Sequence, residues 1–471
     1  PMFEGGVPGP GVEPLGVAGA YAAAKLTCKK GETLLIPRRD GDGFAVDAVL
    51  LVGAGKREDV DTVVLRRVLG RVGQTARRFG TVATTFALAA DGDPADAVQA
   101  VAEGIGLGAY RFDRLKTKTK PKDAGDLKRV VVLGEAGWNA AAMKKAASRA
   151  GVLVDAVAWA RDLVNLPAGD LPPAAIADEA RALATANGLT CKVWNETQLR
   201  AKGFGGILGV GQGSVNPPRL IELTYTGAGK ATPIALTGKG IAFDSGGLSI
   251  KDAAGMETMK DDMGGAASIL ATMRAIALLK PKLNVIAAIP CAENMPSGTA
   301  QKPGDVIRHY GGLTSEVLNT DAEGRLILAD ALALLAEREP RLIIDTATLT
   351  GACMIALGPD IAGAMGNDDA LAREVIDAGA AVGEPIWQLP LFRDYRALLD
   401  SNVADMRNIG KRYGGAITAA LFLSEFVGET PWLHLDIAGP AFSENGTDLG
   451  PKGATGVPVR TLVRFLLDRA A

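Results

Sequence analysis

Two carboxylates and a guanidinium lie within five residues of one another in the segment from Asn319 to Leu326. If this backbone is extended, Asp321, Glu323 and Arg325 point to the same side, because alternate side chains of a strand share a face. Such a group could bind cations and an anion. A helix cap is the alternative, since Thr320 and Glu323 stand ahead of an apolar run with the spacing of a capping box. The segment alone leaves both interpretations open.

A second group of charged residues lies upstream, where Lys239 and Asp244 follow the apolar run 233–236. That run predicts a buried strand, so both residues would lie at its carboxyl end, where open α/β sheets bind their ligands. Lys251 and Asp262 come next. Taken singly, Lys251 could be a solvated loop lysine and Asp262 could cap the helix predicted after it. The presence of both groups in one chain favours a site.

The two groups form motifs that resemble those of a known family. They read Lys-Gly-Ile-Ala-Phe-Asp-Ser-Gly-Gly from Lys239 and Asn-Thr-Asp-Ala-Glu-Gly-Arg-Leu from Asn319. With them the chain is similar to the leucyl aminopeptidases of the cytosolic, two-metal (cytosol aminopeptidase) family. The resemblance covers residues 160–471 well and the first part of the chain in general layout only. One departure is Ala242, where relatives often carry threonine, and it is not a ligand position.

The resemblance implies two divalent metal ions per subunit, manganese or zinc, with two carboxylates shared between them. The implied ligands are Lys239, Asp244, Asp262, Asp321 and Glu323, of which Asp244 and Glu323 are shared. The chemistry agrees, since such cations accept carboxylate oxygens and bridging carboxylates screen their mutual repulsion. A lysine binds metal only as the neutral amine, and losing its proton costs roughly 4 kcal/mol at neutral pH. Metal coordination must offset that cost.

The resemblance also implies a reaction, in which a metal-bridging water releases the N-terminal amino acid of a short peptide. One metal would hold the free α-amine, so only N-terminal bonds are cut. Lys251 would polarise the scissile carbonyl and stabilise the oxyanion. Arg325 cannot act as a base, because it stays protonated. It would hold a bicarbonate ion that serves as the general base.

The side-chain pocket of relatives matches four positions here: Met259, Thr348, Gly351 and Ala438. This lining is mostly apolar, so it should accept leucine or methionine and disfavour aspartate or glutamate, whose charge would lose hydration without a partner. For Met259, plain core packing is the alternative interpretation.

Other catalytic chemistries find little support in the sequence. The chain has only two histidines, His309 and His434, which excludes a histidine-rich zinc site. There is no His-Glu-x-x-His and no Gly-x-Ser-x-Gly to support a serine triad. We expect both histidines to be structural. No glycine-lysine pair completes a P-loop, and we interpret Gly209 to Gly213 as a glycine-rich turn.

Composition predicts a cytoplasmic enzyme. The net charge is −2, the apolar fraction 48%, and no apolar run approaches a membrane span or an export signal. The four cysteines are scattered without Cys-x-x-Cys, which favours reduced thiols. The resemblance adds an expected homohexamer whose active sites face an enclosed interior.

An accessory DNA-binding role is the alternative from another functional class, because some relatives bind DNA. The basic residues that could serve it are Arg111, Arg114, Lys116, Lys118, Lys120 and Lys122. A pI near 6.0 offers no general basic footprint, so we favour a solvated loop here.

Apolar periodicity predicts an α/β protein of two domains, with residues 1–160 as a smaller N-terminal domain ending in a linker helix and 161–471 as the catalytic domain. In the first part, strands at 32–37, 48–52, 81–88 and 129–133 alternate with helices at 62–78 and 94–110. In the second, strands at 220–226, 233–236, 284–288, 342–347 and 432–435 alternate with helices at 174–186, 264–279, 326–337 and 416–426. A mixed, largely parallel sheet with helices on both faces is the expected catalytic core.

Overall fold

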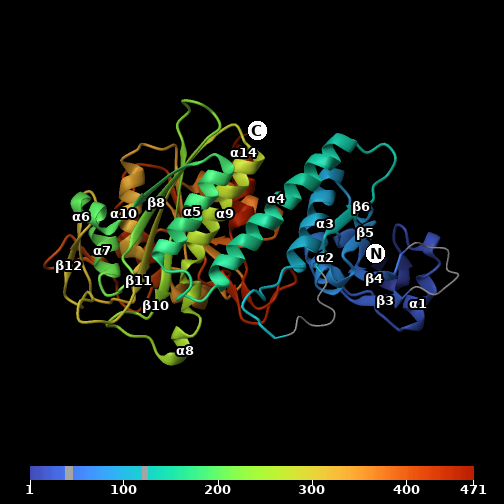
Figure 1. Cartoon of the computed structure of the whole chain (residues 1–471), viewed down its shortest axis with the longest axis horizontal. Helices are drawn as coiled ribbons and strands as arrows, with labels where there is room; N and C mark the ends of the chain where they lie inside the picture. The colour runs from blue at the N-terminus through green and yellow to red at the C-terminus, as the bar shows by residue number, and fades with distance from the viewer. Residues whose placement is uncertain (38–45, 119–125, 471) are drawn as a thin grey trace. The chain divides into compact units, whose positions relative to one another are not determined.

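The computed structural model of the chain describes residues 1–37, 46–118 and 126–470 (Figure 1). The chain forms two compact units. The N-terminal unit contains Pro1–Ala158 and Glu444–Lys452, and the C-terminal unit contains Trp159–Ser443 and Gly453–Ala471. We did not predict that residues 444–452 would belong to the first unit.

The N-terminal unit is an α/β structure with two small sheets. The first has the order β2-β1-β4-β3, and the second is the parallel pair β5 and β6. These strands are β1 (Met2–Phe3), β2 (Val7–Pro8), β3 (Thr33–Pro37), β4 (Ala48–Gly55), β5 (Thr81–Thr84) and β6 (Arg129–Val132). The strand predicted over 81–88 ends early, because Thr84 Oγ1 accepts a hydrogen bond from Phe86 N and a 3-10 helix follows over Phe86–Ala89.

Two amphipathic helices, α2 (Thr62–Ala76) and α3 (Pro94–Gly108), pack together in this unit. Asp61 caps α2 by accepting a hydrogen bond from Val64 N, and Asp93 caps α3, whose first residue is proline. Besides a short helix, α1 (Ala18–Ala23), the chain has the long helix α4 (Ala140–Asn165), which runs through the residue at which the two units divide.

The C-terminal unit is built on a nine-stranded mixed sheet with the order β16-β15-β18-β14-β9-β11-β8-β7, and β10 pairs with β11. Its strands are β7 (Thr190–Trp194), β8 (Arg219–Thr226), β9 (Ile234–Gly238), β10 (Gly240–Asp244), β11 (Asn284–Asn294), β14 (Ile343–Ala347), β15 (Ala362–Gly366), β16 (Ile386–Gln388) and β18 (Trp432–Asp436). The pairs β9–β11, β9–β14, β14–β18, β10–β11 and β15–β16 are parallel. The predicted fold class is therefore confirmed, although β7, β10, β15 and β16 were not predicted.

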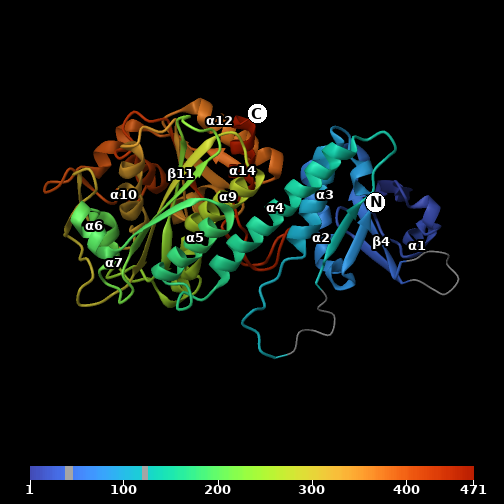
Figure 2. The same ribbon diagram turned by 45° about the horizontal axis from the view of Figure 1, so that its top comes forward.

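Helices cover both faces of this sheet, as Figures 1 and 2 show for α5 and α9 on one face and α10 on the other. The helices are α5 (Pro173–Asn187), α6 (Glu196–Lys202), α7 (Gly205–Gly211), α8 (Ala253–Met256), α9 (Gly264–Leu279), α10 (Gly324–Ala336), α11 (Gly351–Leu357), α12 (Asp369–Val382), α13 (Gly415–Ser424) and α14 (Val459–Arg469). The glycine-rich turn expected at 209–213 is partly wrong, because residues 205–211 are helical and pack against α10 and β11.

Short strands complete the unit: β12 (Val306–Arg308), β13 (Thr314–Glu316) and β17 (Met406–Arg407) form one small sheet, and β19 (Phe442–Ser443) pairs with β20 (Gly453–Ala454). The helical run 253–279 is long and apolar enough to cross a membrane, but 83% of its apolar window is buried inside the protein. It is a core helix of the C-terminal unit.

Parallel strands bring the predicted site residues to one edge of the large sheet. β9 ends at Gly238, just before Lys239, and β10 ends at Asp244. β14 ends just before Thr348, and β18 ends at Asp436. Because these strands share one direction, their carboxyl ends meet at the same edge, where ligands of α/β sheets bind.

Candidate metal centre

Lys239 joins two buried carboxylates at this edge. Its Nζ atom lies 2.8 Å from Asp262 Oδ1 and 2.8 Å from Glu323 Oε1, and it donates a hydrogen bond to the carbonyl oxygen of Thr348 at 2.9 Å. Only 3% of the Lys239 side chain is exposed. A buried amine that close to two acids forms the centre of a charged cluster.

Asp244 is fixed from several sides at the end of β10. Its Oδ1 atom accepts hydrogen bonds from Asn294 Nδ2 and Gly246 N, both at 2.8 Å. Its Oδ2 atom lies 2.9 Å from Nζ of Lys251, which also forms an ion pair with Asp321. Lys251 is therefore not a solvated loop lysine.

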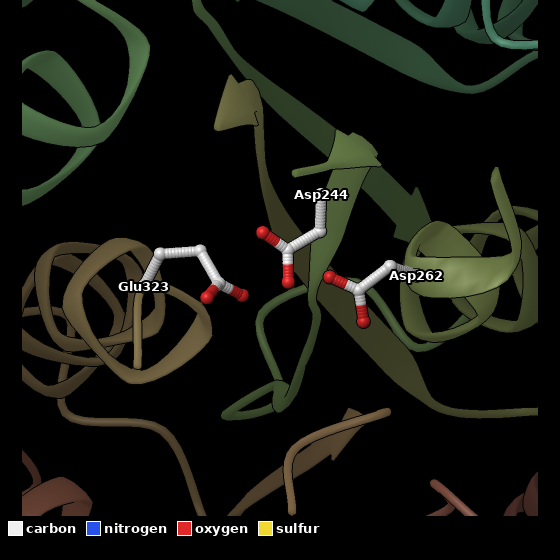
Figure 3. Close-up of side chains that lie close together, drawn as sticks. All are labelled: Asp244, Asp262 and Glu323. Atoms are coloured by element: carbon white, nitrogen blue, oxygen red, sulfur yellow. The ribbon is translucent and has the colours of Figure 1, made fainter. Parts of the chain in front are cut away.

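The carboxylates of Asp244, Asp262 and Glu323 point toward one another (Figure 3), and their ligand atoms lie within 4.8 Å of one another. Three buried acids at this distance repel unless cations lie among them. Asp262 Oδ2 and Glu323 Oε2 have no hydrogen-bond partner within the described part of the chain, although both are buried. Carboxylate oxygens with unused lone pairs fit divalent cations well, so the donor set suits a metal centre.

The pKa values reflect this crowding in the metal-free protein. Burial raises the pKa of Glu323 and of Asp262, and neighbouring carboxylates raise them further. Burial by itself would lower the pKa of Lys239, but Asp262 and Glu323 outweigh it and hold that pKa above its ordinary value. Burial likewise opposes the charge of Lys251, yet Asp244 and Asp321 raise its pKa. Both lysines are thus ammonium groups without metal.

Two loops that carry these residues are tied together. Gly246, with a φ of 83°, turns the chain after Asp244, and a side chain there would collide with Ser249 O at 2.6 Å. Thr320 Oγ1 donates to the carbonyl oxygen of Gly246 at 2.6 Å and accepts from Ser249 N at 2.7 Å. The loop after β10 and the loop before α10 are therefore held in one register.

The segment around Asp321 has neither of the predicted local structures. Its backbone is a turn followed by helix α10 from Gly324, so the extended interpretation is wrong. The capping box is also wrong, because Thr320 bonds the other loop and Glu323 makes no side-chain cap. Asp262 is not a cap either, since it lies in a 3-10 helix over Met259–Met263 and its Oδ1 atom pairs with Lys239.

Arg325, in the first turn of α10, is buried beside the acids. Its Nη1 atom donates to the carbonyl oxygen of Asn408 at 2.8 Å, and Nε has no hydrogen-bond partner among the described residues. Burial lowers the pKa of Arg325 to about 10, although Glu323 and Asp436 act in the opposite direction. A buried guanidinium with an unused donor is suited to hold a small anion.

Three of the four predicted pocket residues lie at neighbouring strand ends. Thr348 Oγ1 donates to Asp262 Oδ1 at 2.8 Å, so this residue contacts the charged cluster directly. Asp436 Oδ1 accepts from the backbone N–H groups of Leu349 and Ala438, both at 3.2 Å, which draws the loops after β14 and β18 together. Gly351 begins α11 on the first of these loops. Met259, the fourth, lies half-buried on the same 3-10 helix as Asp262.

Both histidines are buried and form structural contacts. His309 Nε2 lies 2.7 Å from Ser315 Oγ, and His434 Nδ1 lies 2.5 Å from Asp345 Oδ1. The indole of Trp432 donates to the second oxygen of Asp345 at 2.7 Å. These contacts place His434 in the core of the sheet, on strand β18.

Several residues that hold the site together were not predicted, chiefly Asn294, Asp436 and Asn408. Asp436 ends a strand that the apolar pattern did predict, so its position at the ligand-binding edge could have been noticed. Asn294 and Asn408 had no such signal, because a lone asparagine in a loop or at a strand end is common.

The basic residues proposed for DNA lie partly outside the described residues, namely Lys120 and Lys122. In the described part, Arg111 forms ion pairs with Asp113 at 3.1 Å and Asp126 at 3.0 Å. Pairing with acids does not favour a role in binding phosphates.

Two domain models of one family match the chain. Residues 158–463 match the cytosol aminopeptidase family, catalytic domain, and residues 17–119 match the N-terminal domain of the same family. A probable cytosol aminopeptidase of Rhodococcus jostii is 46% identical over 462 residues, which are 97% of this chain and 89% of the relative. A probable cytosol aminopeptidase of Roseiflexus castenholzii is 46% identical over 447 residues, which are 93% of this chain and 90% of the relative.

Two solved structures are similar to this chain over most of its length. The bottromycin maturation enzyme BotP in complex with Mn has a TM-score of 0.89 and 37% identity, and the match covers 100% of this chain and 98% of BotP. A mutant of tomato leucine aminopeptidase has a TM-score of 0.85 and 35% identity, covering 96% of this chain and 86% of its own.

Proposed function

Since this chain belongs to the cytosol aminopeptidase family and is an aminopeptidase, a hydrolase, we propose that it releases leucine and other apolar residues from the N-termini of short peptides in a metal-dependent reaction. The proposed ligands of two divalent cations, manganese or zinc, are Lys239, Asp244, Asp262, Asp321 and Glu323. The observation that carries this proposal is the convergence of Asp244, Asp262 and Glu323, whose ligand atoms lie within 4.8 Å of one another. One oxygen of Asp262 and one of Glu323 have no hydrogen-bond partner among the described residues.

The cations, when bound, supply a Lewis acid and lower the pKa of water to near neutrality, which gives a nucleophile at physiological pH. The protein contributes the placement of the ligands. Lys239 must release its proton to become one, and its raised pKa opposes that release in the metal-free state. The repulsion between the buried carboxylates of Asp262 and Glu323 favours metal binding, because a cation between them relieves it.

Lys251 is proposed to polarise the substrate carbonyl. It stays protonated, because Asp244 and Asp321 raise its pKa. Its side chain is 17% exposed, so it lies at the solvent-accessible side of the cluster, where a peptide can reach it. A fixed ammonium there stabilises the oxyanion that forms when the carbonyl is attacked.

Arg325 is proposed to hold the anion that moves the proton, with bicarbonate as the candidate. Its burial, and an Nε donor that has no partner in the part of the chain that the structure describes, support this role. Arg325 itself does not exchange a proton in the reaction, since even a pKa of about 10 leaves it charged at neutral pH.

The proposed substrate preference rests on the strand-end loops that carry Thr348, Gly351 and Ala438, and on Met259, which lies on the same 3-10 helix as Asp262. None of these four residues is charged, so an acidic side chain would lose hydration without gaining a partner. We further propose a cytoplasmic homohexamer, in keeping with the family. No observation favours DNA binding.

Metal removal tests this proposal. The protein as isolated is analysed for bound metals, stripped with a chelator, and assayed on a panel of aminoacyl substrates before and after addition of Mn²⁺ or Zn²⁺. We expect Leu-peptide hydrolysis to disappear and return while the fold persists. Full activity in a verified metal-free sample would refute the metal-dependent mechanism. A preference for acidic N-termini would refute the proposed pocket.

A further inference from the structure

We infer that Asn408 is a positioning residue that holds both the metal-ligand loop and Arg325 in place. The inference rests on the proposed function, because it takes Asp321 and Glu323 as ligands and Arg325 as an anion-binding residue. Asn408 lies more than 80 residues beyond these groups in the chain and carries no charge, so neither motif includes it.

Asn408 is fully buried and follows β17, which pairs in parallel with β13. Its side chain spans the loop between β13 and α10. The Oδ1 atom accepts hydrogen bonds from the backbone N–H groups of Leu318 at 2.9 Å and Asn319 at 3.4 Å. The Nδ2 atom donates to the carbonyl oxygens of Asn319 at 2.7 Å and Ala322 at 3.4 Å.

These contacts bracket Asp321 on the chain, with Asn319 before it and Ala322 after it. The backbone of Asn408 extends the same support, since its N–H donates to Glu316 O at 2.8 Å and its carbonyl accepts Arg325 Nη1 at 2.8 Å. One residue therefore joins the start of the loop, the loop itself and the first turn of α10.

The loop needs such support because it is neither helix nor strand. Thr320 is also fixed, by hydrogen bonds of its side chain to Gly246 and Ser249 and by a bond from Asn294 Nδ2 to its carbonyl oxygen. The side chain of Asp321 is 32% exposed and forms an ion pair with Lys251 of the cluster. Its direction thus depends on the backbone on either side, to which Asn408 is bonded at Asn319 and Ala322. Residues that orient ligands in this way typically contribute 10–100-fold to metal affinity or activity.

Asn408→Asp tests the inference, because it changes one atom and leaves the shape of the side chain. The new oxygen would face the carbonyl oxygens of Asn319 and Ala322, to which the amide donates now. We expect affinity for Mn²⁺, measured by calorimetric titration of the metal-free protein, to fall about 10–100-fold, with a similar loss in kcat and a smaller change in KM. Asn408→Ser, a milder change, should shift both in the same direction if the aspartate variant does not fold.

Asn284→Asp is the matched control. Asn284 is also buried, and its side chain makes three comparable bonds, accepting from Ala228 N at 2.9 Å and donating to Gly229 O at 2.9 Å and Ala231 O at 2.7 Å. It should lower the melting temperature without changing Mn²⁺ affinity or kcat. If both Asn408 variants behave like this control, the positioning role is wrong. Asp321→Asn separates the two hypotheses, since unchanged Mn²⁺ affinity in that variant would refute the ligand assignment itself.

Discussion

Lys239 and Thr348 contact each other and also share one partner. The Lys239 amine donates to the carbonyl oxygen of Thr348 at 2.9 Å, and Thr348 Oγ1 donates to Asp262 Oδ1, the oxygen that lies 2.8 Å from the same amine. The loop that begins the proposed substrate pocket is therefore bonded to the proposed metal ligands. Deprotonation of Lys239 should therefore affect both the pocket loop and the metal ligands.

Metal binding should release protons and strengthen with rising pH. In the metal-free protein the pKa of Lys239 is raised by Asp262 and Glu323 in spite of burial, and burial raises the pKa of both acids. Each group must be deprotonated to coordinate a cation, so protons and metal compete. Titration calorimetry with Mn²⁺ in buffers of different ionisation enthalpy measures the number released. A count of zero at pH 7, with affinity independent of pH, would contradict Lys239 as a ligand.

Gly324→Ala should displace Lys239 without unfolding the chain. A Cβ atom at Gly324 would lie 2.6 Å from Cε and 2.8 Å from Nζ of Lys239, and the flexible amine end would move rather than the helix. Because Nζ would leave its place between the two acids, we expect Mn²⁺ affinity to fall about 10–100-fold with little change in melting temperature. Gly298→Ala is the control, since a Cβ there meets nothing within 4 Å. Equal affinities in the two variants would count against the position assigned to Lys239.

Lys251→Ala should separate catalysis from metal binding. We expect kcat to fall about 10²–10³-fold, the usual loss on removing an oxyanion donor. Mn²⁺ affinity should be unchanged or higher, because the ammonium of Lys251 now neutralises Asp244 and Asp321, two proposed ligands. Lys302→Ala, which removes an exposed lysine paired with Asp305 at 3.4 Å, should alter neither quantity. Weaker Mn²⁺ binding by Lys251→Ala, with an unchanged rate per bound metal, would show that Lys251 is a metal ligand and not the oxyanion donor.

The fold class could be predicted from the sequence because the central strands β9, β11, β14 and β18 are buried throughout, and such strands read as apolar runs. Strand β10 was missed, since its five residues include the motif residue Asp244 and begin with glycine. Strand β15, which lies between β16 and β18 and is rich in glycine and alanine, shows neither an apolar run nor alternation.

Site residues could be named from two motifs, but their geometry could not. The turn at Asp321 depends on hydrogen bonds from Thr320 and Asn408 to segments about 70 and 90 residues away. Local patterns contain no information on such partners, so both local interpretations of that segment were wrong. Arg325 and Glu323 come close to the other charges because helix α10 packs on the sheet, a tertiary effect that overrides local preference.

His434→Gln should destabilise the C-terminal unit in a way that depends on pH. Burial disfavours the charged ring, but Asp345 outweighs it and raises the pKa of His434. The folded protein therefore holds this proton more tightly than the unfolded chain, whose histidine pKa is about 6.5. The contribution of the pair is complete below that pH and is lost as pH rises through the higher folded pKa. Breaking a buried pair typically costs about 3–5 kcal/mol.

Differential scanning calorimetry of the wild type and His434→Gln between pH 5.5 and 8.5 measures this effect. The difference in melting temperature between the two proteins should be largest at the acidic end and shrink as pH rises. His309→Gln, which removes a ring lying 2.7 Å from the hydroxyl of Ser315 and 3.3 Å from Asp330 Oδ1, shows how loss of the second buried histidine changes the melting temperature. A difference for His434→Gln that grows with pH would show that the ring is held neutral in the folded protein, contrary to the charge pairing with Asp345 at 2.5 Å.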